Sequence, residues 1–112
     1  MQENRKDPRY RTLGRARIRG LLEGDVLLKN MSITGCCLEC TFHPEIKSNE
    51  VYEVEIDPED AVHVGKFSLE AECRWIRNGD HFCEIGFQIV SSPTGRHFQR
   101  YVDYLTYHSD SV

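Results

Sequence analysis

The chain has 112 residues, of which 39% are hydrophobic and 29% are charged, and its formal net charge is −4. This length predicts a single domain with its own core, because chains divide into two domains only at roughly twice this size. No stretch approaches the roughly 20 apolar residues that cross a bilayer, and the N-terminal residues lack the apolar segment of a secretion signal. We therefore expect a cytoplasmic protein without membrane insertion.

The charges are distributed unevenly along the chain. Residues 1–20 carry seven basic and two acidic side chains, whereas the other 92 residues carry seven basic and sixteen acidic ones. A basic segment on an acidic body indicates one localised anion site, although a solvated charged tail would have the same composition. The acidic body and the lack of a recognition-helix signature argue against DNA binding.

Alternation of polar and apolar residues predicts short strands from the N-terminal part onward. A hairpin is expected over residues 14–29, with strands at 15–19 and 26–29 and a turn at Glu23-Gly24-Asp25. Further strands are expected at 36–41 and 51–56. The strand at 15–19 is expected to be half-buried, and the strand at 51–56 to have one wet face, because Tyr52, Val54 and Ile56 alternate with glutamates.

The clearest alternation runs over residues 67–75 and returns over residues 83–89. Between them, Asn78-Gly79 predicts a tight type I′ turn, in which both central residues need a positive φ. The alternation places Trp75 on the inward face, where an aromatic residue is more often part of the core than a platform for a ligand.

A C-terminal helix is expected over about residues 93–107. Ser92-Pro93 supplies an N-cap and a first-turn proline, and apolar residues follow at helical spacing: Phe98, Tyr101, Val102 and Leu105. This stripe would close the core, although a face for docking a partner is an alternative. The predicted fold is an all-β antiparallel sheet closed, or nearly closed, into a barrel, with residues 1–11 as a flexible basic leader and residues 12–112 as the domain.

The cysteines are odd in number, and without an export signal a disulfide framework is not expected. Cys37-x-x-Cys40-x-x-His43 has a spacing that resembles metal ligands, but the second C-x-x-C of a structural zinc site is missing. We expect no metal and interpret all five thiols as small buried hydrophobic groups in strands, at Cys36, Cys37, Cys40, Cys73 and Cys83.

Two polar motifs stand beside the first predicted hairpin. Arg5-x-x-x-Arg9 precedes it, and Asn30-x-Ser32-x-x-Gly35 follows it. Alone, the arginine spacing is weak because it recurs elsewhere in the chain, and the second motif could be a polar turn whose glycine permits a left-handed backbone. Together they predict a guanine nucleotide site, because arginine binds phosphate and the O6 and N7 of guanine while the loop offers an amide, a hydroxyl and backbone N–H groups.

With these motifs the chain resembles the PilZ domain family, bacterial receptors for cyclic di-GMP. The resemblance covers nearly the whole chain and includes Trp75 on one strand and Gly86-Phe87 on the next. It implies a six-stranded antiparallel β-barrel with a C-terminal helix. It also implies a binding site in which arginines grip phosphate and guanine, loop residues line the opposite side, and a tryptophan packs near a base: Arg5, Arg9, Asn30, Ser32, Gly35 and Trp75.

The chain departs from the family pattern at two positions. Asn30 stands where aspartate is common, and it keeps an acceptor and adds a donor but loses the charge, which weakens a contact to guanine. Asn4 stands where some members carry a further arginine, so the number of bound ligands stays open.

The resemblance implies a non-catalytic receptor that needs no cofactor, orders its leader on binding cyclic di-GMP and signals to a separate protein. Motility, biofilm and virulence control are outputs known for the family, and a monomer or weak dimer is expected. The alternative is an adaptor that acts through protein contacts alone. An enzyme is not expected, because the carboxylates fall on wet strand faces or turns and the histidines lack motif context: His43, His63, His81, His97 and His108.

Overall fold

The structure, a computed structural model, describes residues 9–21, 26–91 and 96–108. Arg5, the turn at Glu23-Gly24-Asp25 and the N-cap pair Ser92-Pro93 lie outside the described residues. The elements follow one another as β1 (Tyr10–Arg11), β2 (Arg15–Ile18), β3 (Val26–Met31), β4 (Gly35–Cys40), β5 (Val51–Asp57), the 3₁₀-helix η1 (Asp60–Val62), β6 (Phe67–Asn78), β7 (Cys83–Ser91) and α1 (His97–His108).

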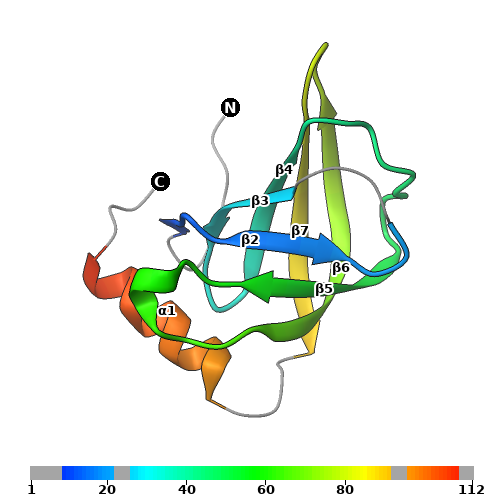
Figure 1. Cartoon of the computed structure of the whole chain (residues 1–112). Helices are drawn as coiled ribbons and strands as arrows, with labels where there is room; N and C mark the ends of the chain where they lie inside the picture. The colour runs from blue at the N-terminus through cyan, green and yellow to red at the C-terminus, as the bar shows by residue number, and fades with distance from the viewer. Residues whose placement is uncertain (1–8, 22–25, 92–95, 109–112) are drawn as a thin grey trace.

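The strands form one antiparallel sheet in the order β1-β3-β2-β5-β6-β7-β4. An additional pairing of β3 with β4 closes the sheet, so six strands form a barrel and β1 is an extra short strand beside β3 (Figure 1). The predicted six-stranded antiparallel barrel with a C-terminal helix is therefore confirmed. Closure also pairs the strand edges that an open sheet would expose.

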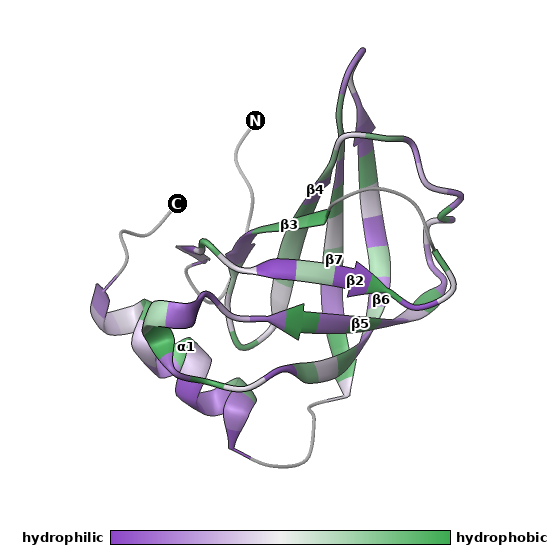
Figure 2. Ribbon diagram, in the orientation of Figure 1, coloured by the Kyte–Doolittle hydropathy of each residue, from purple (hydrophilic) through white to green (hydrophobic). Residues whose placement is uncertain are grey.

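The core fills the barrel because apolar residues alternate along the strands (Figure 2). Val54 and Ile56 of β5 and Leu69 of β6 are almost fully buried, and polar neighbours alternate with them. Helix α1 closes the barrel on the side of β5 and η1, and its buried residues are the four expected from the helical spacing. The Phe67 ring lies edge-on to Tyr101, with centroids 6.1 Å apart, so this stripe belongs to the core.

All five cysteines are buried and free, in β4, β6 and β7, which confirms their interpretation as small hydrophobic residues in strands. Across residues 9–21, 26–91 and 96–108, no group of histidine, cysteine, aspartate and glutamate side chains is arranged to hold a metal ion. In the same ranges, no helix combines the length and apolar character that spanning a membrane requires.

The hairpin between β6 and β7 forms as predicted, but its turn differs. Asn78 still belongs to the ladder, where it pairs with Cys83, and the loop is closed by a 2.9 Å hydrogen bond from the Gly79 N–H to the Phe82 carbonyl. Neither Asn78 nor Gly79 has a positive φ, so the predicted type I′ turn is wrong. The longer loop allows the Phe82 ring to pack on Gly79, a contact that a two-residue turn could not provide.

Candidate functional site

Arg9, which directly precedes β1, lies against the first residue of β4. A Cβ on Gly35 would stand 2.6 Å from Arg9 Nη2 and 3.3 Å from its Cζ, so the guanidinium occupies the space above the glycine. β1 brings Arg9 there, because Tyr10 pairs with Met31 and Arg11 with Asn30. The structure therefore brings Arg9 together with the loop that contains the second motif.

Ser32 organises this loop from within. Its hydroxyl oxygen accepts hydrogen bonds from the N–H groups of Thr34 and Gly35, at 3.1 and 3.3 Å, and its own N–H donates to the Gly35 carbonyl at 2.8 Å. The residue is only 2% exposed. Local hydrogen bonds of this kind define a tight turn, so Ser32 acts on the shape of the site through the loop backbone.

Gly35 is required by close packing. A side chain there would meet the Phe87 carbonyl oxygen at 2.6 Å as well as the Arg9 guanidinium. Its φ is not positive, so the left-handed backbone considered from the sequence is not the reason for a glycine. Its role is to let the arginine and the neighbouring strand approach the loop.

Asn30, on β3, leaves a buried acceptor without a partner. The residue is 8% exposed, and its Oδ1 atom accepts no hydrogen bond from the part of the chain that the structure describes. An unpaired buried acceptor costs about 1–3 kcal/mol. A ligand that donates a hydrogen bond to this oxygen would remove that cost.

A bulge in β6 moves Trp75 to the outer face of the barrel. Cys73 pairs with Phe87, but Trp75 pairs with Gly86, because the register shifts between the two β6 residues. Phe87 points into the core, so the adjacent Gly86 faces outward, and the indole lies directly on it. The expectation that Trp75 continues the inward alternation is therefore wrong, since that alternation holds only up to the bulge.

Trp75 and Arg9 border the same patch of the outer surface. Gly35 of β4 pairs with Gln88 of β7, two residues along from Gly86, which corresponds to about 7 Å of extended strand. An arginine, an unpaired amide oxygen and a partly exposed indole thus lie on neighbouring strands of one face. These are the groups that bind phosphate, accept a hydrogen bond from a base and stack on its ring.

An ion-pair network that the sequence analysis did not predict lies on the same face, around Glu84, two residues from Gly86 on β7. Glu84, with 4% of its side chain exposed, accepts hydrogen bonds from Lys29 and Arg77. Burial raises the pKa of the carboxyl, but the hydrogen bonds and charges of the two cations outweigh it, so the pKa lies below its ordinary value. The three residues meet because β3, β4, β7 and β6 pair in this order, and alternation within one strand does not contain that information.

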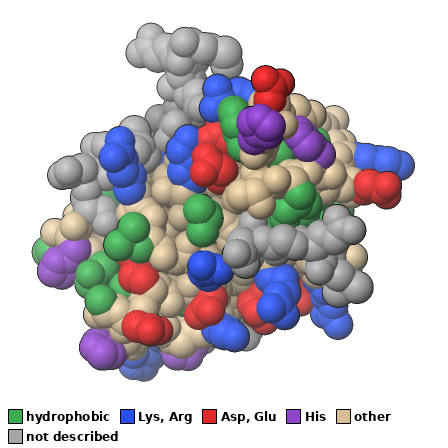
Figure 3. Space-filling view, turned by 45° about the horizontal axis from the view of Figure 1, so that its top comes forward, with side chains coloured by type: hydrophobic (Ala, Val, Ile, Leu, Met, Phe, Trp, Pro, Cys, Tyr) green, Lys and Arg blue, Asp and Glu red, His purple; other side chains and the backbone are tan. Residues whose placement is uncertain are grey.

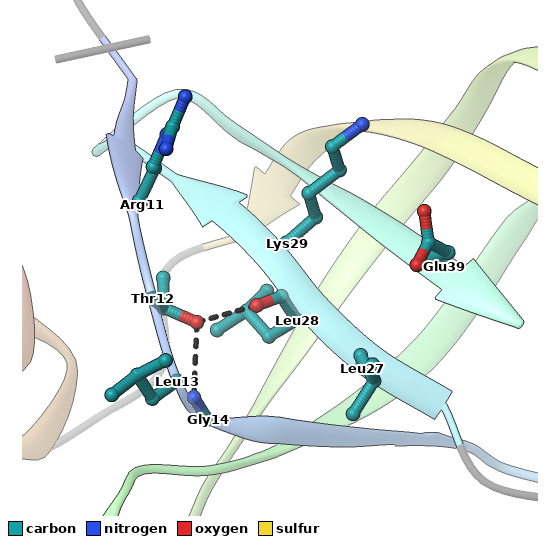
Figure 4. Close-up of a pocket in the computed structure, with 8 residues that line it drawn as sticks. All are labelled: Arg11, Thr12, Leu13, Gly14, Leu27, Leu28, Lys29 and Glu39. Carbon is teal, nitrogen blue, oxygen red and sulfur yellow. Dashed lines mark hydrogen bonds between the residues drawn. The ribbon is translucent and has the colours of Figure 1, made fainter.

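A pocket of about 430 Å³ lies beside the segment that connects β1 to β2. The charged ends of Arg11 and Lys29 project from the same side of their strands (Figure 4). On the face shown in Figure 3, basic and acidic side chains lie beside one another. The pocket is lined by Arg11, Thr12, Leu13, Gly14, Leu27, Leu28, Lys29 and Glu39.

Comparison with known proteins identifies the chain at the level of a family. The family model of the PilZ domain matches residues 3–106, which include both motifs and the Trp75 strand. No curated protein matches the chain.

Proposed function

The chain belongs to the PilZ domain family, and we propose that it is a non-catalytic receptor for cyclic di-GMP. The family as a whole supports cyclic di-GMP binding. The proposed site is the outer face of the barrel between Arg9, the Asn30–Gly35 loop and Trp75.

The observation that carries the proposal is the packing of the Arg9 guanidinium on Gly35. A guanidinium presents a planar set of donors that matches phosphate oxygens, or the O6 and N7 acceptors of guanine, in pairs. Because the N–H groups of Ser32, Thr34 and Gly35 are already bonded within the loop, the guanidinium supplies the positive charge and the donors that an anionic ligand would need beside it. Arg5, which precedes Arg9 by four residues, is proposed to bind the same ligand.

The remaining site residues receive different roles in this proposal. Asn30 accepts a hydrogen bond from the guanine N1 or N2 group through its unpaired Oδ1, and the bond is weaker than one to an aspartate because no charge assists it. The Trp75 indole offers a ring face for stacking. Ser32 and Gly35 act indirectly, by shaping the loop and admitting Arg9.

We further propose that the ligand holds the segment from Arg5 to Arg9 against the barrel and so changes the surface that a partner protein meets. The segment leads directly into β1, whose two residues pair with β3 next to Asn30. Binding would therefore alter a surface continuous with the barrel. In this proposal the protein acts in the bacterial cytoplasm on a separate protein that controls motility, biofilm formation or virulence.

Titration calorimetry of the purified chain tests the proposal. Cyclic di-GMP is expected to bind saturably, whereas GTP and cyclic AMP at the same concentrations give no heat of binding, and the fitted stoichiometry reports the number of ligands. Absence of both heat and a thermal shift with cyclic di-GMP, in protein that is folded by circular dichroism, would overturn the proposal. That result would favour an adaptor that acts through protein contacts alone.

A further inference from the structure

Three distant parts of the chain meet at the Glu59 carboxylate. The Tyr101 hydroxyl of helix α1 donates to Oε1 at 2.6 Å, and the Leu13 N–H, between β1 and β2, donates to Oε2 at 3.1 Å. Both carboxylate oxygens are thus used, one for the helix and one for the N-terminal segment. Glu59 itself directly precedes η1.

The helix and the N-terminal segment are also in close contact at Gly14. A Cβ on Gly14 would stand 2.7 Å from the Tyr101 hydroxyl oxygen and 3.1 Å from the Asp57 carbonyl. Tyr101 is fully buried and packs on Phe67, so its hydroxyl has a fixed position. The segment therefore rests against a rigid part of the core.

Burial does not anchor Leu13, because its side chain is 84% exposed. Hydrogen bonds hold the neighbouring residues Thr12 and Gly14 in place instead. The Thr12 hydroxyl donates to the Leu28 carbonyl at 2.5 Å and accepts from the Gly14 N–H at 3.1 Å (Figure 4). The bond from the Leu13 N–H to Glu59 ties the same three residues to the chain just after β5, the strand that pairs with β2.

The anchored segment, residues 12–14, follows Arg9 and β1 in the chain and is called the stem below. Leu13 follows Arg9 by four residues, about 13 Å of extended chain, and the two β1 residues between them pair with β3. A shift of residues 12–14 would displace Arg9 from Gly35. The guanidinium packs so closely on this glycine that no side chain would fit between them.

We infer that Tyr101 and Glu59 are positioning residues for the cyclic di-GMP site. They fix residues 12–14 so that Arg9 is held over the Asn30–Gly35 loop. The inference rests on the proposed function and adds to it two residues that lie outside both motifs. Loss of the Tyr101 hydroxyl is expected to weaken cyclic di-GMP binding by about three- to tenfold, the range for one net hydrogen bond.

Calorimetry of Tyr101→Phe with cyclic di-GMP measures this effect, and Tyr107→Phe is the matched control, because Tyr107 lies on the same helix and is 86% exposed. Tyr107→Phe should bind as the wild type does. Glu59→Gln, which keeps an acceptor oxygen, should give a smaller loss than Glu59→Ala. Equal affinities of Tyr101→Phe and the wild type would overturn the inference while leaving the receptor proposal intact.

A double-mutant cycle separates positioning from a general loss of structure. Arg9→Lys keeps the charge but lacks the planar fork, whose bonds depend on placement. If Tyr101 acts through Arg9, Tyr101→Phe should weaken binding less in the Arg9→Lys background than in the wild type. An equal loss in both backgrounds would contradict positioning.

Hydrogen exchange measures the stem without any ligand. In Tyr101→Phe the Leu13 amide should exchange faster, while the Ile85 amide in the centre of β7 should keep its wild-type rate. Unchanged exchange at Leu13 would overturn the inference. Absence of cyclic di-GMP binding by the wild type would instead reject the proposed function, and with it the role of Tyr101 as a positioning residue, whatever the exchange rates are.

Discussion

The indole of Trp75 fills the space that a side chain at position 86 would need. A Cβ on Gly86 would stand 2.2 Å from both Cε2 and Nε1 of the ring. Their strands are paired at this point, so the indole packs on the outer face of β7 at Gly86. In the proposed site, a ring held in this way would be preorganised for stacking, because little side-chain freedom would remain to be lost on binding a base.

Gly86→Ala is expected to displace the indole from β7. The chain has one tryptophan, so the change should appear directly as a shift in its fluorescence emission. Cyclic di-GMP affinity should fall several-fold, because a stacking contact is worth about 0.5–1.5 kcal/mol. Gly20→Ala is the control, since nothing lies within 4 Å of a Cβ there and the alanine would be unfavourable only through the backbone φ of +90°. An unchanged emission spectrum in Gly86→Ala would contradict the observed packing.

Gly35→Ala is expected to affect both stability and binding. The added methyl group would meet the Arg9 guanidinium and the Phe87 carbonyl oxygen, each at 2.6 Å. We expect a loss of about 1–3 kcal/mol in the free energy of unfolding, which is typical of overpacking, and at least about tenfold weaker binding as Arg9 moves. Denaturant unfolding and calorimetry measure the two effects, and a variant with wild-type affinity would show that the Arg9–Gly35 contact does not matter for the ligand.

Glu84→Gln should change how stability depends on pH. Because the folded-state pKa of Glu84 is lowered, its ion pairs stabilise the fold above the unfolded-state value of about 4.3, and this stabilisation is lost as the pH falls through the lower folded value. The variant should lose about 1–3 kcal/mol at pH 7, and its difference from wild type should shrink below about pH 4.

Urea unfolding between pH 3 and pH 7 measures this difference for Glu84→Gln. Glu53→Gln is the comparison, because the Glu53 pair with Arg19 is exposed, at 42% and 77% of the side chains, and should contribute less than about 1 kcal/mol. A constant difference between Glu84→Gln and wild type across this range would contradict the role assigned to the network.

The thiols should be unreactive in the folded protein. Burial raises the pKa of Cys36 to about 12 and that of Cys37 and Cys40 to about 11. At pH 8 a thiol with a pKa of 11 is ionised to about one part in a thousand, and the thiolate is the reactive form. Ellman's reagent should therefore detect five thiols quickly in guanidinium chloride and only slowly in the native state, whereas rapid native labelling would disprove their burial.

The elements of the fold that could be predicted from the sequence are those in which one face of a strand or helix is buried. Val54 and Ile56 alternate with glutamates, and Tyr101 and Leu105 recur at helical spacing, so the pattern itself contains the information. The type I′ turn was wrong because Phe82 packs on Gly79, a contact that the dipeptide Asn78-Gly79 does not indicate.

The candidate site was predictable only in part, because a local sequence pattern does not contain the contacts between distant segments. Arg9, Asn30 and Gly35 are named by their motifs, and the structure brings them together. The outward position of Trp75 depends on a bulge in the pairing of β6 with β7, and the contacts of Glu84 depend on the register of β3, β4, β7 and β6. Such features arise from pairing between distant segments, which the alternation within one segment does not specify.

Calorimetric titration of Arg9→Ala with cyclic di-GMP, beside the wild type and Arg19→Ala, measures whether the arginine that packs on Gly35 binds the ligand. Arg9 packs on the motif loop, whereas the exposed Arg19 pairs with Glu53. We expect a roughly 10- to 150-fold loss of affinity for Arg9→Ala, as is typical of charge-assisted hydrogen bonds, and wild-type binding for Arg19→Ala. Equal binding of cyclic di-GMP by Arg9→Ala and the wild type would contradict a role of Arg9 in the site.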